Sequence, residues 1–404
     1  MSGFKGWHVL GASFVTAMLM AGATFYSFQH FVSPIEAEFG ITREQTNIGM
    51  MIFLLSSAIW AAIVGRMLGR IKPRQLALTG LVAFTLGFVL LSRSTNPSQM
   101  LWIIGGLIGF GFTACGPFMS NALTTNWFYR YRGRALGIAA VATSAGGFVV
   151  QPIFSYLIET QGWRGALLYI AIAIAVISAI LIFKYFISKP EDIGQFADGD
   201  QTAAPQQITS ANPGFILRNR DFWIIALACG LLLGSDQALL ISLKPFGEDL
   251  GFSNMQATLI PTVVAGSAIL GKIGIGWMVE RFDKRYVFAL VCASNIAFLL
   301  TTILATGFAP MILIASVAGI AIGGIYPVWT SITAQTFGRE YFAPAIGLMN
   351  LVTVIFAIGA MGYVGNSYAT HGNYYPSFKV LMIVAGLAAV VMMFVRTKSK
   401  ERGT

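Results

Sequence analysis

Two stretches of this chain, "SPIEAEFGITREQTNI" (residues 33–48) and "KPFGEDLGFSNMQATL" (residues 244–259), have the same pattern and lie 211 residues apart. The positions that agree are Pro34 with Pro245, Glu38 with Asp249, Gly40 with Gly251, Thr42 with Ser253, and Gln45 with Gln256. Proline, glycine and short polar side chains are the residues that determine local backbone geometry. The same loop therefore occurs twice, half a chain apart, which indicates a duplicated structural unit.

The composition is that of a membrane protein. Of 404 residues, 56% are hydrophobic and only 10% are charged, whereas about a quarter of an ordinary soluble domain is charged. The apolar residues form blocks of about twenty, the length that spans a hydrocarbon core of about 30 Å as a helix. The blocks are 7–30, 47–68, 76–93, 99–127, 133–159, 164–187, 222–246, 258–280, 286–306, 310–337, 343–368 and 376–396. They predict an all-α polytopic membrane protein with twelve transmembrane helices.

One long polar stretch, residues 188–221, interrupts the apolar blocks. Its proline, glycine, glutamine and mixed charges are typical of a linker. It divides the chain into a predicted N-terminal six-helix bundle, residues 1–187, and a predicted C-terminal six-helix bundle, residues 222–404.

Further pairs of similar stretches follow the same spacing. "GRMLGRIKPR" (65–74) and "GWMVERFDKR" (276–285) lie 211 residues apart, and "GPFMSNALTTNWF" (116–128) and "YPVWTSITAQTFG" (326–338) lie 210 apart. Matching order and spacing indicate two parallel repeats, which in membrane transporters pack around a pseudo-twofold axis and hold the site between them. The fold predicted is two six-helix repeats.

The net charge of +10 is explained by the positions of the basic residues. All but six of the 26 Lys and Arg lie in or beside segments that are cytoplasmic if both termini are cytoplasmic. An excess of basic residues in short loops marks the cytoplasmic side. We therefore expect a multi-pass protein of the cell membrane, of the bacterial inner-membrane type, and no nucleic-acid partner.

The pair "GRMLGRIKPR" and "GWMVERFDKR" resembles the motif found between helices 2 and 3 and between helices 8 and 9 of the major facilitator superfamily. The resemblance covers the whole chain. It implies the fold of that superfamily, a monomer, and a cytoplasmic gate. The gate residues implied are Gly65, Arg70, Gly276, Glu280 and Arg281.

Within that superfamily, "FYSFQHFVSPIEAEFGITREQ", "NWFYRYRGRALGIA", "GWRGALL" and "RNRDFWIIAL" resemble the monocarboxylate porters and the related oxalate/formate antiporters. The resemblance implies a carrier of small monocarboxylates, and it places an arginine in helix 8 where this chain has Lys272. It also implies that helices 1, 4, 7 and 10 line the cavity.

Comparison of the two repeats identifies two residues that break their symmetry. Asp236 in helix 7 corresponds to Phe25, and Lys272 in helix 8 corresponds to Ala61. No other Asp, Glu, Lys or Arg lies deep within a predicted helix. Counted along each helix, the depths of these two residues in the membrane are within about 6 to 9 Å of each other. An ionisable group there costs at least about 2.5 kcal/mol, so it marks a functional site by default. A structural ion pair between them is the alternative.

These residue types suit a carboxylate carrier. Lys272 provides a charge and three donors for the substrate carboxylate. Asp236 is the candidate proton-coupling group, because desolvation favours the neutral form of a buried carboxyl; it would hold Lys272 in the empty carrier and take up a proton when substrate displaces it. Polar residues at similar depth complete the candidate site: Asn121, Thr125, Tyr326, Tyr26, Ser331 and Asn350. Each is also a candidate for helix-packing hydrogen bonds alone.

Three functions remain open at this point. The first is secondary active transport of small monocarboxylate anions such as lactate or pyruvate, by alternating access and coupled to protons or to organic-anion exchange. The second is export of amphiphilic or cationic compounds, which a cation in the cavity disfavours. The third is a membrane receptor without transport.

Phosphate-loop, "HExxH", "GxSxG" and Cys-x-x-Cys patterns do not occur in the sequence, so we expect no enzyme activity, no cofactor and no metal site.

Overall fold

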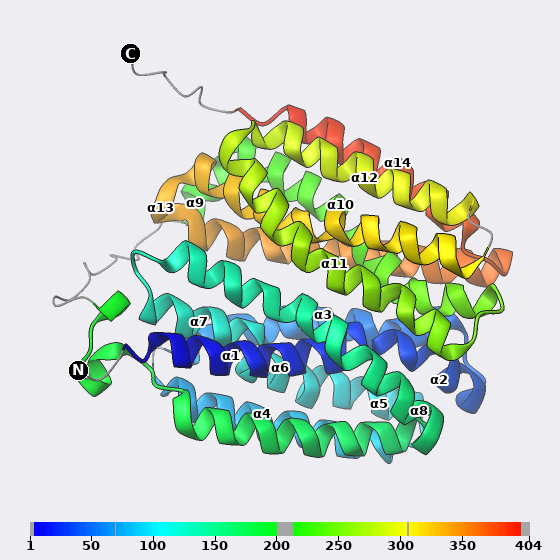
Figure 1. Ribbon diagram of the computed structural model, residues 1–404, viewed down its shortest axis with the longest axis horizontal. Helices are drawn as coiled ribbons and strands as arrows, with labels where there is room; N and C mark the ends of the chain where they lie inside the picture. Colours follow the sequence, from blue (N-terminus) through cyan, green and yellow to red (C-terminus); the bar gives the residue numbers. More distant parts are fainter. Residues whose placement is uncertain (1–3, 69, 200–212, 305–306, 397–404) are drawn as a thin grey trace. The chain divides into compact units, whose positions relative to one another are not determined.

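The computed structural model describes residues 4–68, 70–199, 213–304 and 307–396, and helices dominate that part of the chain (Figure 1). The described residues contain eleven helical spans that are long and apolar enough to cross a membrane. The helices are α1 (Gly6–Ala21), α2 (Val32–Phe39), α3 (Arg43–Met67), α4 (Pro73–Ser92), α5 (Pro97–Ile103), α6 (Gly109–Cys115), α7 (Pro117–Trp127), α8 (Arg132–Tyr185), α9 (Pro213–Arg218), α10 (Arg220–Asp249), α11 (Asn254–Arg281), α12 (Lys284–Leu304), α13 (Phe308–His371) and α14 (Tyr375–Met393). Single π-helical turns follow α1 (η1, Gly22–Tyr26) and α5 (η3, Ile104–Ile108), and short 3₁₀ turns occupy η2 (Phe28–His30), η4 (Pro190–Ile193) and η5 (Ala197–Gly199).

The eleven spans account for the twelve predicted crossings because α8 turns back on itself. The span within α8 has 52 residues, Arg134–Tyr185, and would extend about 78 Å, more than twice the hydrocarbon core. Gly162 interrupts it with φ 69° and ψ 167°, and Figure 1 shows the two arms of α8 running in opposite directions. The long α13 likewise contains two spans, Phe308–Phe337 and Pro344–His371. The prediction of an all-helical polytopic membrane protein is confirmed.

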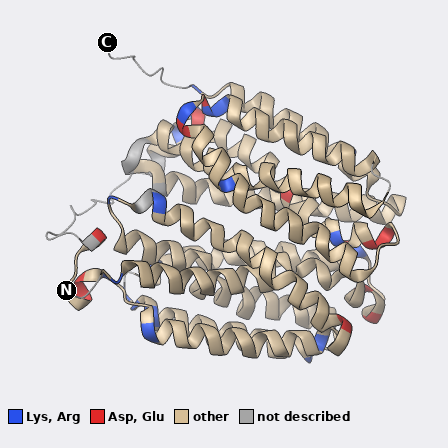
Figure 2. Ribbon diagram, viewed as in Figure 1, with Lys and Arg blue, Asp and Glu red and all other residues tan. Residues whose placement is uncertain are grey.

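Most charged residues lie toward the ends of the helices, and the lengths between contain few of them (Figure 2). Large apolar side chains are exposed along the same lengths, among them Trp102, Ile355 and Ile383. A continuous apolar exterior is the surface that lipid chains cover.

The repeated loop has the same local structure in both copies. The Thr42 Oγ1 accepts from the Gln45 backbone N at 3.3 Å, and the Gln45 side chain accepts from the Thr42 backbone N at 2.9 Å. Ser253 and Gln256 form the equivalent pair at 3.3 and 3.1 Å. These are capping boxes, which satisfy two free N–H groups at the start of a helix, here of α3 and α11.

The glycine of each copy ends the preceding helix. Gly40 follows α2 with φ 62°, and Gly251 follows α10 with φ 82°. A residue with a Cβ is strained in this left-handed region, and glycine is not. The shared pattern therefore encodes one helix end and one helix start, written once in each half.

Packing divides the chain into two compact units. Unit 1 consists of Met1–Gln206 with Ile241–Gly266, and unit 2 consists of Gln207–Leu240 with Ser267–Thr404. Helices α10 and α11 each contribute residues to both units. The division into residues 1–187 and 222–404 with a linker between them stays a prediction.

Polar contacts attach the segment Ile241–Gly266 within unit 1. Glu248 forms an ion pair with Lys244 and accepts a hydrogen bond from Ser33 at 2.6 Å. Arg43 bridges Asp249 at 3.2 Å and Glu36 at 3.1 Å. The acidic end of α10 is thus held by the start of α3, which is the helix that the first copy of the repeated loop begins.

Small residues bring α11 and α13 into close contact in unit 2. A Cβ built on Gly271 would overlap the carbonyl group of Ile320, and one built on Gly323 would overlap that of Ala268. Transmembrane helices associate through such small residues because backbones then approach closely.

We predict that Gly323→Ala destabilises the protein, because the new methyl group meets backbone that cannot move aside as a side chain does. Overpacking of this kind costs about 1 to 3 kcal/mol. A thermal-unfolding measurement in detergent checks this, with Gly359→Ala in the same helix as the matched control, since a Cβ there meets no atom within 4 Å. Equal melting temperatures for the two variants would contradict the packing argument.

Candidate functional site

Asp236 lies on α10 inside unit 2, with 3% of its surface exposed. Its Oδ1 accepts a hydrogen bond from the Nδ2 of Asn295 on α12 at 2.7 Å. Its Oδ2 is buried and has no hydrogen-bond partner among the described residues. A buried carboxylate with one neutral donor is poorly compensated for its loss of water, so ionisation at this position is costly.

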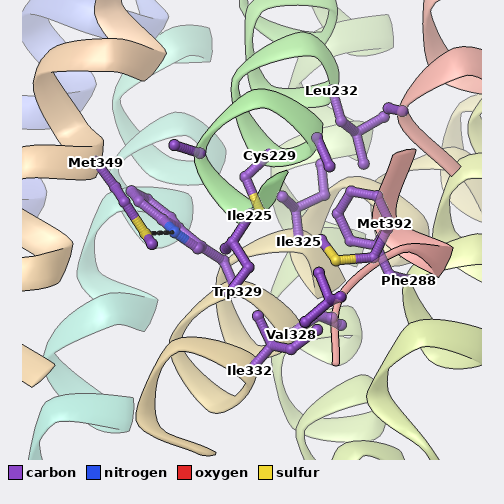
Figure 3. Close-up of a cluster of buried hydrophobic side chains, with 14 of the residues drawn as sticks. Ile225, Cys229, Leu232, Phe288, Ile325, Val328, Trp329, Ile332, Met349 and Met392 are labelled. Atoms are coloured by element: carbon purple, nitrogen blue, oxygen red, sulfur yellow. Dashed lines mark hydrogen bonds between the residues drawn. The ribbon is translucent and has the colours of Figure 1, made fainter. Parts of the chain in front are cut away.

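The turns of α10 and α12 next to this hydrogen bond are apolar. Buried residues recur at helical spacing on α10 as Ile225, Cys229, Leu232 and Asp236, and on α12 as Phe288, Cys292, Asn295 and Leu299. Ile225, Cys229, Leu232, Phe288 and Cys292 belong to one buried cluster. Figure 3 shows several of these side chains packed with Ile325, Val328 and Met392 in one buried cluster. Asp236 and Asn295 therefore form a polar pair in an interface that is otherwise built like a hydrophobic core.

Lys272 lies on α11 at the level where this helix packs against α13. Its neighbours one turn away on the same face are Ala268 and Gly276. Ala268 contacts Gly323, and Gly276 lies near Pro327. Lys272 is half-buried.

Tyr326 lies on α13 between Gly323 and Pro327, so it occupies the same level as Lys272 on the neighbouring helix. Its side chain is 39% exposed, and its ring meets that of Trp329 edge to face at 6.0 Å. Of the residues predicted for the site, the structure brings Lys272 and Tyr326 to one level of unit 2.

Three other predicted site residues belong to unit 1. Asn121 and Thr125 lie one turn apart on α7, where the Thr125 Oγ1 donates to the Asn121 carbonyl at 2.6 Å. Tyr26 ends the π-helical turn that follows α1, and its ring lies against Gly147 of α8. A π-helical turn frequently occurs at a functional position in a helix.

The remaining two predicted residues lie elsewhere on α13. Ser331 is five residues beyond Tyr326, which places it on a different side of the helix, and Asn350 is in the second span, where it is exposed. Their role in binding stays a prediction.

The residues implied for the gate occupy equivalent places in the two repeats. Gly65 of α3 lies against the ring of Phe118 on α7, and Gly276 of α11 lies 4.0 Å, measured from a built Cβ, from Pro327 on α13. Arg281 stacks on Trp277, with its guanidinium carbon 4.1 Å from the ring centroid. Arg70 and Glu280 are exposed. In each repeat the motif glycine thus lies beside the second membrane span after its own.

The loop after the second motif carries its own ion pair. Arg285 Nη2 and Asp283 Oδ2 are 2.8 Å apart. The hydrogen bonds from Arg285 hold the pKa of the Asp283 carboxyl below its usual range, because they stabilise its charged form. This pair fixes the turn between α11 and α12.

The structural ion pair that the sequence left open is not observed. The ion pairs found between described residues do not include one between Asp236 and Lys272. Asp236 faces α12, and its hydrogen-bond partner is Asn295.

Sequence reasoning missed Asn295, although the repeat contains the signal for it. Position 295 corresponds to Phe84 at the spacing of 211 residues, so Asn295 breaks the symmetry as Asp236 does. Phe84 is fully buried in its own repeat. A search for buried amides, and not for charged residues alone, would have identified it.

Comparison with known proteins identifies the family. The sequence model of the Major Facilitator Superfamily matches residues 13–294 and 227–404. The chain belongs to the Major Facilitator Superfamily. It is therefore a multi-pass membrane transporter of small organic substrates and not an enzyme, and the resemblance read from its gate motifs is confirmed.

Several relatives are similar to this superfamily member over most of their length. Monocarboxylate transporter 13 of Bos taurus is 24% identical over 96% of this chain and 89% of its own. Monocarboxylate transporter 12 of Mus musculus is 25% identical over 83% of this chain and 75% of its own. The uncharacterized MFS-type transporter YcxA of Bacillus subtilis is 24% identical over 95% and 94%.

A solved structure shares the fold. It is that of a bacterial homologue of the human lysosomal transporter Spinster in an inward-facing, unoccupied conformation, with a TM-score of 0.76, 14% identity, and coverage of 98% of this chain and 97% of its own. The occupied form of that homologue gives a TM-score of 0.69. At this identity the likeness concerns the fold alone.

Proposed function

We propose that this protein is a secondary active transporter of small monocarboxylate anions, such as lactate or pyruvate, coupled to protons by alternating access. The observation that carries the proposal is Lys272, a lysine within a membrane helix of a chain similar over most of its length to monocarboxylate transporters. A lysine held away from bulk water attracts a carboxylate far more strongly than it does in water. Anion binding explains why the sequence has a lysine here, where a charged side chain costs free energy to insert into the membrane.

The other polar residues have supporting roles in this proposal. Tyr326, at the level of Lys272, offers a hydroxyl to the substrate carboxylate. The binding roles expected of Asn121 and Thr125 in unit 1 stay predictions. Asp236 takes up and releases the coupling proton. Its unpaired Oδ2 is the atom to which that proton binds. Protonation removes the cost of a buried charge, so the neutral carboxyl is the form that suits its surroundings.

Purified protein in liposomes tests the proposal. We expect labelled lactate and pyruvate to accumulate when the interior is made alkaline, and to exchange with internal substrate when no gradient is imposed. Empty liposomes are the control. Accumulation of an amphiphilic cation such as ethidium, with no transport of either acid, would favour the cation exporter and overturn the proposal.

We also propose that both termini and residues 188–221 face the cytoplasm. In a variant whose three native cysteines are replaced, a cysteine at Asp200 is expected to react with an impermeant thiol reagent from the inside. A cysteine at His371, which is exposed at the end of α13, is expected to react from the outside. Reaction of both from the same side would contradict the orientation. Position 200 lies outside the described residues.

A further inference from the structure

We propose that Asn295 is a positioning residue for proton coupling: by holding the Oδ1 of Asp236, it allows this carboxyl to alternate between its neutral and its ionised form. This inference rests on the proposed function of Asp236 and adds a residue to it. The geometry is a 2.7 Å hydrogen bond between two side chains that are 3% and 2% exposed, on α10 and α12.

The chemical identity of the partner is the first argument. A lysine or arginine at this position would stabilise the ionised carboxyl alone, and a leucine would leave the neutral form alone stable. An asparagine amide contains both a donor and an acceptor. An amide Nδ2 donates to an ionised carboxyl, as it does here, and an amide Oδ1 can accept from the O–H of a neutral one. Asparagine is therefore suited to a carboxyl that must change its protonation state in every cycle.

The surroundings of the pair are the second argument. Among the described residues, the titratable side chain close to Asp236 is the buried thiol of Cys292 on α12, and the buried thiol of Cys229 on α10 lies close to Cys292. Among the described residues, no charged group is recorded as acting on the Asp236 carboxyl. Within the described part of the chain, Asn295 is thus the hydrogen-bond donor to this carboxyl. The balance between the neutral and the ionised form of Asp236 therefore depends on Asn295 more than it would in a polar site.

The repeat gives a third argument. The residues at the corresponding positions of the first half are Phe25 and Phe84. Asp236 and Asn295 are thus both polar where the first half has an aromatic residue, and these two polar side chains contact each other. That two residues in contact both break the symmetry indicates a function for the two together.

Two variants of Asn295 and one control test the inference. With Asn295→Leu, we expect gradient-driven accumulation of lactate to fall by about 10-fold or more, because the ionised carboxyl loses a charge-assisted hydrogen bond. Exchange of internal for external lactate should survive. Asn295→Gln retains the donor and the acceptor and should keep part of the accumulation. Thr302→Val is the matched control, because Thr302 is a buried polar residue two turns away on α12, and it should accumulate lactate as wild type does.

Infrared spectroscopy provides a readout that needs no substrate. The band of the protonated Asp236 carboxyl is identified as the one absent from Asp236→Asn. In Asn295→Leu this band should persist to a pH higher by about one to two units than in wild type, because the ionised form has lost its donor. An unchanged band together with wild-type accumulation in Asn295→Leu would overturn the inference. Wild-type accumulation in Asp236→Asn would instead overturn the proposed role of Asp236, so the two failures are distinguishable.

Discussion

Lys272→Gln is expected to abolish uptake of small carboxylates. Removing one partner of a buried charge pair costs about 2 to 5 kcal/mol, so uptake at low substrate concentration should fall by about 30-fold or more. Glutamine keeps a similar length and a hydrogen-bonding end, so the loss is assigned to the charge. Initial rates of lactate uptake in liposomes, at matched amounts of inserted protein, provide the measurement.

Two further variants control this result. Lys272→Arg retains the charge and should keep part of the activity, although a planar guanidinium binds a carboxylate with a different geometry from an ammonium group. Gly274→Ala lies on the same helix, where a Cβ meets no atom within 4 Å, and should transport normally. Wild-type uptake by inserted Lys272→Gln protein would end the assignment of this lysine to substrate binding.

Much of the fold follows from the sequence because its signals are local. The positions shared by residues 33–48 and 244–259 become two capping boxes and two left-handed glycines, which depend on a few adjacent residues. The apolar blocks become membrane spans because length and hydropathy decide a crossing. The number of continuous helices differs from the number of apolar blocks, because one helix can contain two blocks. In α8, Gly162 reverses the direction of the chain, and the residues on both sides of it are helical.

The candidate site was harder to predict because it depends on which side of each helix faces which neighbour. The order of residues along α10 and α11 puts Asp236 and Lys272 within about 6 to 9 Å of each other in depth. In the structure, however, Asp236 faces α12 and Lys272 lies beside the contact with α13. Adjacency of two helices in sequence does not determine their mutual orientation. The partner of Asp236 therefore became evident from the packing of α12, where Asn295 is buried among core residues.

The structure alters the expectation for Asp236→Asn. If Asp236 were the structural mate of Lys272, this substitution would leave a lysine without compensation in the membrane, and folding should fail. The carboxyl instead accepts from Asn295 through Oδ1, and an asparagine at position 236 presents a carbonyl oxygen in the same place. We therefore expect Asp236→Asn to insert and fold at nearly the wild-type level, as measured by yield and thermal unfolding in detergent.

Transport by Asp236→Asn should then separate two activities. An amide mimics the neutral carboxyl permanently, so accumulation of lactate against its gradient should disappear, whereas exchange should survive because it proceeds without release of the proton. Lactate counterflow and pH-driven uptake in the same liposomes measure both. Loss of folded protein that is restored by adding Lys272→Gln would show that the two residues interact after all. Undiminished pH-driven accumulation would move the coupling proton away from Asp236, onto another group of the carrier or onto the substrate carboxylate, which can cross the membrane in its neutral form.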